Sequence, residues 1–254
     1  MSFYHQIDEF LAKHKVAALC IVTDTKGSTP RKIGSKMLVG PEGCTYGTIG
    51  GGAIEQQVIE EAREIIRSNK AQKKVYQLEA DLSMQCGGSV EVYIEPLGNR
   101  PKLYIFGAGH VGKALAGFAH KVDFDVTLID FRPTLSDEEK TVYRFLQGDY
   151  YEILETLDYG ENTYVAIMTP NHEHDFELLK RLGKKPCTYL GMIGSKRKVA
   201  KVREILLNEK HFTDEEFNRF DTPIGLPMAA ETPEEIAISI LAKLIDVRNK
   251  KLKG

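Results

Sequence analysis

A glycine-rich segment in the middle of the chain has the spacing of a phosphate-binding turn. It reads Gly107-Ala108-Gly109-His110-Val111-Gly112, follows the apolar run 102–106, and opens a segment with helical spacing of apolar residues. In such a turn the first glycine permits a tight bend, the second lets the backbone approach a pyrophosphate, and the third lets helix and strand pack closely. The N–H groups at the helix start then hold the anion. We therefore expect Gly107, Gly109, His110 and Gly112 to border a cofactor that contains a pyrophosphate or a similar anion.

An acid and a base follow the next strand. Asp130 ends the apolar run 126–130, about 20 residues beyond the turn, where a ribose hydroxyl is bound in dinucleotide sites. Arg132 has the charge to pair with a 2′-phosphate or with another anionic group. The sequence therefore leaves NAD, NADP and a different dinucleotide open. A Rossmann-like domain whose glycine turn holds no ligand is a further alternative.

Two later turns bring more polar groups to the same place. His172 follows one expected strand, and Ser195 and Arg197 follow the next. Because all strand-to-helix turns of a parallel sheet lie on one edge, we expect these three residues to contribute to cofactor binding. Ser195 with the basic run 196–198 predicts a second anion site at a helix start. The alternative is a capped helix with a solvated basic first turn.

The segment from His172 to Asp175 contains two histidines and two acids, but it does not have the pattern of a metal site. Residues two apart point in different directions on a helix, and no further ligands recur at zinc spacing. We expect no metal there.

The N-terminal part contains further glycine loops. Gly50, Gly51 and Gly52 directly precede a helical pattern, so backbone N–H groups there can approach an anionic or bulky ligand. Glu55 falls in the first turn of that helix, either as a proton-transfer group or as an acid that stabilises the helix dipole. Cys86, which precedes two glycines, could present a thiolate to a soft metal or a persulfide. A buried structural cysteine is the alternative for Cys86.

The other three cysteines do not form a motif with Cys86. The spacings of all four match neither a zinc or redox motif nor a disulfide framework, so we expect free thiols. Cys20 and Cys187 lie in apolar, strand-like runs and are expected in the core. Cys44, like Cys86, lies beside a glycine and is a candidate for chemistry.

Two domains are needed to position these residues. Expected helices at 4–14 and 53–67 and strands at 16–22, 37–39, 44–49, 73–79 and 89–97 make a smaller mixed α/β domain, 1–98. Turn residues near 96–101 mark the boundary. Beyond it strands and helices alternate, which predicts a Rossmann-like, doubly wound parallel sheet over 99–254. A final helix to about residue 247 begins with a capping box from Thr232 to Glu235.

The composition limits the class of protein. With 28% charged residues and a net charge of −2, the chain has no charged tail and no sign of nucleic-acid binding. Its apolar runs are too short to cross a bilayer, and its first residues do not have the pattern of a signal peptide. We expect a cytoplasmic protein without a membrane partner.

Taken together, segments 25–31, 47–55, 86–88 and 107–112 resemble the xanthine dehydrogenase accessory protein family (XdhC/CoxI) over nearly the whole chain. The resemblance implies a small N-terminal domain followed by a Rossmann domain. It implies a chaperone in the maturation of a molybdenum hydroxylase, which binds molybdenum cofactor (molybdopterin), supports its sulfuration with a cysteine desulfurase, and delivers it to the apo-enzyme.

Carried onto this sequence, the resemblance implies that Gly50, Gly51, Gly52, Glu55 and Cys86 border a molybdopterin site, held between the domains. A homodimer is expected from family and base rates. The main alternative is an NAD(P)-dependent oxidoreductase acting on a small molecule. A nucleotide-sensing module without catalysis is a third, but it leaves the N-terminal loops unused.

Overall fold

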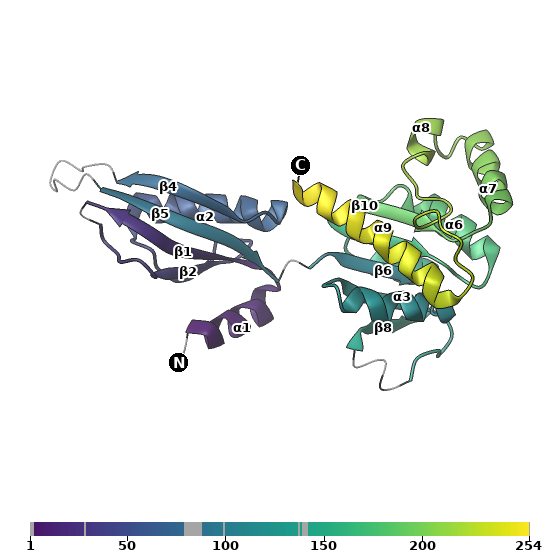
Figure 1. The fold of residues 1–254 in the computed structure, drawn as a ribbon, viewed down its shortest axis with the longest axis horizontal. Coiled ribbons are helices and arrows are strands. Elements are labelled where there is room, and N and C mark those ends of the chain that lie inside the picture. The colour runs from purple at the N-terminus through teal and green to yellow at the C-terminus, as the bar shows by residue number, and fades with distance from the viewer. Residues whose placement is uncertain are drawn as a thin grey trace. The chain divides into compact units, whose positions relative to one another are not determined.

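The computed structural model describes residues 3–27, 29–78, 88–98, 100–136, 138 and 142–253. The chain forms two compact units, Met1–Asn99 and Arg100–Gly254. Each unit has its own five-stranded sheet and its own buried core (Figure 1). No helix in the described ranges is both long enough and apolar enough to span a membrane.

The first unit is built on an antiparallel sheet with the strand order β3-β2-β1-β5-β4. In chain order its elements are α1 (Phe3–His14), β1 (Ala17–Lys26), β2 (Lys36–Val39), β3 (Thr45–Gly47), α2 (Gly52–Ser68), β4 (Gln72–Leu78) and β5 (Gly88–Leu97). Strand β1 extends beyond the expected 16–22. It continues because β5 pairs along it as far as Lys26, past an irregularity after Val22.

Helix α2 covers the sheet of the first unit. Its buried residues recur every three or four positions, as required of a helix with one apolar face, and they are Ile54, Val58, Ala62, Ile65 and Ile66. They join alternate residues of β1, among them Ala18 and Cys20, in one core. The helix ends at Asn69, whose left-handed backbone lets its N–H bond the carbonyl of Ile65. Packing of α2 therefore fixes the Gly50–Gly52 loop at its start.

The second unit is a parallel sheet with the strand order β10-β9-β6-β7-β8. Its elements are β6 (Lys102–Phe106), α3 (His110–His120), β7 (Asp125–Asp130), β8 (Arg144–Gln147), α5 (Tyr150–Thr156), β9 (Gly160–Ile167), α6 (His172–Leu182), β10 (Cys187–Met192), α7 (Lys196–Asn208), α8 (Asp214–Phe217) and α9 (Pro233–Lys253). This order is that of dinucleotide-binding folds. The expected Rossmann-like, doubly wound sheet is confirmed.

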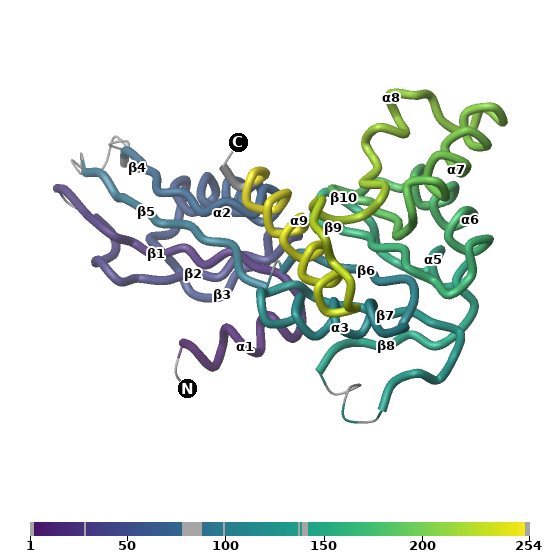
Figure 2. Tube along the Cα trace, turned by 45° about the vertical axis from the view of Figure 1, so that its right-hand side comes forward, coloured from purple at the N-terminus to yellow at the C-terminus, as the bar shows by residue number. Residues whose placement is uncertain are grey.

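Helices cover both faces of this parallel sheet. Helices α3 and α9 pack against each other on one face, as Figures 1 and 2 show, and α5, α6 and α7 pack on the other. The central strand β6 serves both cores, because Leu103 and Ile105 point to one face and Tyr104 and Phe106 to the other. Burial on both faces explains why the residues of this strand after Lys102 are apolar or aromatic.

Two features at the C-terminal end differ from expectation. The short helix α8, capped by a reciprocal Thr213–Glu216 pair, was not expected. Helix α9 has the expected Thr232–Glu235 capping box, but it continues to Lys253 rather than ending near 247. Arg248 contributes to this extension: its guanidinium donates to the carbonyl of Val122 and lies 5.1 Å from the Phe124 ring.

Candidate functional site

The order of the parallel strands marks one place for a ligand. The chain leaves β6 toward β7 and β8 on one side and returns to β9 and β10 on the other. The strand order therefore reverses between β6 and β9, and in open α/β sheets ligands bind at the carboxyl edge at this point. The turn after β6 and the turn after β9 meet there, since a Cβ on Gly107 would lie 2.2 Å from the carbonyl oxygen of Met168.

The three glycines of the turn have different roles. Gly107 has φ +114° and no room for a side chain, and a Cβ on Gly112 would lie 2.0 Å from the carbonyl oxygen of Gly107. Packing of the turn therefore requires glycine at both positions. Gly109, by contrast, precedes α3 and has no protein atom within 4 Å of its Cβ position. The space beside Gly109 is open to a ligand.

The start of α3 can receive an anion. No side chain caps it, and its first turn contains no acid. The N–H groups of that turn carry the positive end of the helix dipole and attract phosphate in many folds. His110, at the first position of the helix, is exposed beside it.

Asp130 lies at the end of β7, beside the glycine turn. Its side chain is fully buried and accepts hydrogen bonds from the N–H of Ala108 at 2.7 Å and from the N–H of Arg132 at 3.0 Å. The Arg132 guanidinium donates to both carboxylate oxygens, at 2.9 and 2.8 Å. Both carboxylate oxygens of Asp130, which we expected to accept hydrogen bonds from a ribose, thus accept them from protein donors.

The pKa of Asp130 reflects these contacts. Burial by itself would raise it, but the hydrogen bonds from Arg132 and Ala108 and the charge of Arg132 outweigh burial, and the pKa is lowered. The pKa of Arg132 is raised, first by its hydrogen bond to Asp130. The carboxylate is therefore ionised at neutral pH, and a cation covers it.

The hydroxyl of Tyr150 is buried near this pair. It makes no hydrogen bond to the described residues, and its pKa is raised by burial and by the charge of Asp130. The Tyr150 ring contacts both Phe131 and His174, with centroid distances of 5.8 and 5.5 Å. Sequence patterns gave no sign of this residue, because a tyrosine in the first turn of a helix is unremarkable by itself.

A second buried ion pair holds the turns after β9 and β10. Asp175 accepts from the backbone N–H and the hydroxyl of Thr169 at 2.9 and 2.7 Å, and from the Lys198 ammonium at 2.5 Å. Lys198 also donates to the carbonyl of Ile193. The sequence predicted Asp175 and Lys198 only as residues near the starts of two helices. Their pairing was missed because it depends on β9 and β10 lying side by side.

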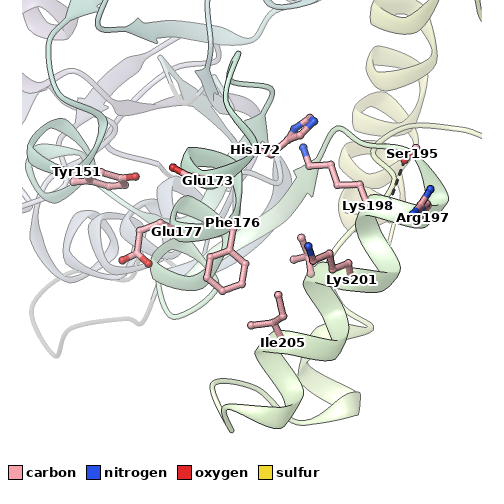
Figure 3. Close-up of a pocket in the computed structure, with 11 residues that line it drawn as sticks. Tyr151, His172, Glu173, Phe176, Glu177, Ser195, Arg197, Lys198, Lys201 and Ile205 are labelled. Atoms are coloured by element: carbon pink, nitrogen blue, oxygen red, sulfur yellow. Dashed lines mark hydrogen bonds between the residues drawn. The ribbon is translucent and has the colours of Figure 1, made fainter.

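The structure brings His172, Ser195 and Arg197 together around one groove. All three line a groove of about 720 Å³ between α6 and α7, which Figure 3 shows, and none of the glycines of 107–112 lines it. Ser195 caps α7 by accepting from the N–H of Lys198. His172 is exposed, with Nδ1 3.9 Å from an oxygen of Asp175.

In the first unit, Glu55 lies against the glycine loop that precedes α2. One oxygen of its carboxylate accepts from the Thr48 hydroxyl at 2.7 Å and from the N–H of Gly51 at 2.9 Å. Gly51 and Gly52 have φ +78° and +65° with open space where a side chain would be, so the loop needs glycine for its backbone conformation. These contacts are those of a residue that holds the start of its own helix.

The cysteines differ in burial. Cys20 is fully buried, and burial raises the pKa of its thiol to about 12. Cys187 is only partly buried, because it lies at the start of the edge strand β10. The Cys44 sulfur lies 3.5 Å from Nε2 of His14. Cys86 lies outside the described residues. Within the described ranges no three histidine, cysteine or acidic residues are placed to hold a metal.

Comparison with known families identifies both parts of the chain. Residues 103–244 match the XdhC Rossmann domain, and residues 10–77 match the XdhC and CoxI family. The chain is 36% identical over 245 residues to the Uncharacterized protein YqeB of Escherichia coli (strain K12), covering 93% of this chain and 44% of that protein. The chain thus spans less than half the length of that relative.

Two further relatives are similar over most of their length. The Molybdenum cofactor insertion chaperone PaoD of Escherichia coli (strain K12) is 22% identical, with 94% of this chain and 86% of that protein covered. A crystal structure described as a xanthine dehydrogenase from Bacillus halodurans has the same fold, with a TM-score of 0.51 and 22% identity over 98% of this chain and 96% of that one. On the match of its Rossmann domain, the chain belongs to the XdhC and CoxI family.

Proposed function

We propose that this protein is a chaperone that binds molybdenum cofactor and takes part in the maturation of a molybdenum hydroxylase. The observation that carries this proposal is the open, uncapped start of α3 at the reversal of strand order, in a chain related over 94% of its length to a molybdenum cofactor insertion chaperone. The N–H groups after Gly109 fit an anionic group, and the phosphate of a pterin cofactor is such a group.

The finer parts of this function are also proposals. The cofactor would supply the molybdenum centre that the client enzyme uses, while this chain would hold its phosphate at Gly109 and shield it until delivery. In this proposal Cys86 supports sulfuration with a cysteine desulfurase as partner, and Gly50, Gly51 and Gly52 border the cofactor. The apo-enzyme of a molybdenum hydroxylase is the second partner, and the chaperone works as a homodimer.

A second candidate is an NAD(P)-dependent oxidoreductase, favoured by the strand order and the glycine spacing. The state of Asp130 counts against NAD, because Arg132 and backbone N–H groups occupy its carboxylate. A free ribose diol would have to displace Arg132 before it could bind there.

Ligand analysis separates the two functions. The protein is purified without oxygen and tested for molybdenum by mass spectrometry, for oxidised-pterin fluorescence, and for NADH and NADPH binding by calorimetry. The proposal expects molybdenum and pterin in stoichiometric amounts, reduced in Gly109→Ala and in Cys86→Ala but not in Cys44→Ala. Binding of NADPH at micromolar affinity with neither metal nor pterin bound would overturn it.

A further inference from the structure

The groove between α6 and α7 has the size and composition of a small-molecule site. Its volume of about 720 Å³ lies within the range of ligand pockets, roughly 300–1,000 Å³. In Figure 3, Phe176 of α6 faces Ile205 of α7 across the groove. Val202 forms part of the floor and is buried in the core beneath it. The groove therefore offers an apolar and partly aromatic surface to a ligand.

One wall of the groove carries cations without an anionic partner. Arg197 and Lys201 are exposed, one turn apart on α7, and neither forms an ion pair with any residue that the structure describes. Lys198 between them is neutralised by Asp175. Both residues line the groove, and no acidic side chain in the described ranges forms an ion pair with either of them.

The opposite wall does not neutralise them. Glu177 of α6 is already paired with Arg181 at 2.7 Å and with Lys180 at 3.8 Å. Glu173 adds one carboxylate in the first turn of α6, where it offsets the dipole of its own helix. The groove keeps a net positive charge toward the start of α7.

The start of α7 adds backbone donors to this charge. Ser195 accepts from the N–H of Lys198, so the N–H groups of Lys196 and Arg197 have no acceptor among the described residues. Cations in the first turn of a helix oppose its dipole. A bound anion would relieve this repulsion and satisfy the two N–H groups.

We propose that this groove binds an organic monophosphate with a planar, apolar body. The dianionic phosphate lies against Arg197, Lys201 and the start of α7, where two uncompensated cations match its charge. The planar body lies on Phe176 and Ile205. This site is separate from the glycine turn and does not depend on the function proposed above.

The test uses flavin mononucleotide as the probe, with riboflavin and inorganic phosphate as partial ligands. Binding to the full chain is measured by calorimetry and by flavin fluorescence. The variants are Arg197→Ala/Lys201→Ala, which removes the cations, and Phe176→Leu, which keeps an apolar side chain but removes the ring. Lys184→Ala is the matched control, because Lys184 is exposed and does not line the groove. Thermal unfolding verifies that each variant is folded.

The proposal expects saturable 1:1 binding of flavin mononucleotide, and weaker binding of riboflavin and of phosphate alone. Removing both cations should weaken binding by a factor of about ten or more, because the phosphate loses both of its charged partners. Lys184→Ala and Gly109→Ala should bind as the wild type does. The proposal is overturned if the flavin does not saturate, if the double variant binds it unchanged, or if Gly109→Ala alone abolishes binding.

Discussion

Arg132 closes over Asp130 by contacting both of its carboxylate oxygens, Nε with Oδ1 at 2.9 Å and Nη2 with Oδ2 at 2.8 Å. In a dinucleotide site that carboxylate normally accepts from a ribose. Here the arginine side chain takes the place of the ribose hydroxyls. The pair therefore influences both which ligands the site accepts and how the second unit responds to acid.

Removing the arginine side chain should make the site more like an NAD site. In Arg132→Ala the carboxylate of Asp130 is free to accept from a ribose, so we expect tighter binding of NADH, by a factor of about ten for one hydrogen bond to a charged group. NADPH should gain nothing, because its 2′-phosphate would meet an uncovered carboxylate. Calorimetry with both nucleotides measures this, with the exposed Arg144→Ala as the control. Equal changes for the two nucleotides would contradict the prediction.

The same substitution should change stability in a pH-dependent way. Because the pKa of Asp130 is lowered in the folded protein, its contribution is present above the unfolded pKa, about 4, and is lost as the pH falls through the folded pKa. In Arg132→Ala burial remains without the guanidinium, so a charged Asp130 destabilises the fold at neutral pH.

The expected loss at pH 7 is about 1–2 kcal/mol. This is less than the roughly 3–5 kcal/mol for breaking a fully buried pair, because the Arg132 side chain is 38% exposed and partly screened. Urea unfolding at pH 7 and below pH 4 should show the difference from wild type shrinking as the pH falls. A difference that is constant with pH would mean that Arg132 acts through packing rather than charge.

Substitutions at two glycines of the turn should have different effects, one on folding and the other on ligand binding. Gly107→Ala places a methyl group 2.2 Å from the carbonyl oxygen of Met168 at φ +114°, so we expect a loss of about 3 kcal/mol or failure to fold. Gly109→Ala has open space and φ −74° and should keep its stability within about 0.5 kcal/mol. Its methyl group would occupy the place of the anion.

Chemical denaturation and molybdenum content measure these two effects. Gly109→Ala should unfold as wild type does and lose most of its bound molybdenum and pterin. Full retention of the cofactor in this variant would mean that the turn does not hold it.

The sequence was sufficient for features whose causes are local. The glycine turn depends on a buried strand, the glycine spacing and a helix start, all within about a dozen residues, and packing at Gly107 and Gly112 agrees with that prediction. The position of Asp130 at the end of β7 was predictable for the same reason. Its pairing with Arg132 was not predicted, because a sequence pattern does not give the rotamer of an arginine. In the structure the backbone N–H of Arg132 donates to Asp130, and its guanidinium lies 5.5 Å from the Phe131 ring.

Features that depend on neighbouring strands could not be predicted. Asp175 and Lys198 are 23 residues apart and meet only because β9 and β10 are paired. The groove between α6 and α7 likewise requires the positions of two helices on one face. Sequence alone therefore placed His172, Ser195 and Arg197 at the same edge of the sheet as the glycine turn, but it could not show that the three line one groove.

The Asp175–Lys198 pair should be important for stability. Lys198→Met leaves a buried carboxylate with no cation, and we expect a loss of about 3 kcal/mol. The double variant Lys198→Met/Asp175→Asn should recover part of that loss, because the amide oxygen of asparagine can still accept from Thr169 and carries no charge. Urea unfolding of both single variants and of the double variant gives the coupling free energy between the two side chains. Additive losses would show that the two side chains do not stabilise each other.

Glu55 tests whether an acid beside a glycine loop is a helix cap or a proton-transfer group. As a cap, its carboxylate oxygen holds Thr48 and the N–H of Gly51, and the amide oxygen of Glu55→Gln can accept the same two hydrogen bonds. We therefore expect Glu55→Gln to unfold within about 0.5 kcal/mol of wild type, and Glu55→Ala to lose about 1 kcal/mol. Both should keep their bound molybdenum when folded.

A proton-transfer group would behave differently, because glutamine cannot exchange a proton. The stability of Glu55→Gln would be unchanged, but this variant would fail to activate the client enzyme. Activation of an apo molybdenum hydroxylase by Glu55→Gln at the wild-type rate would leave Glu55 with the structural role alone.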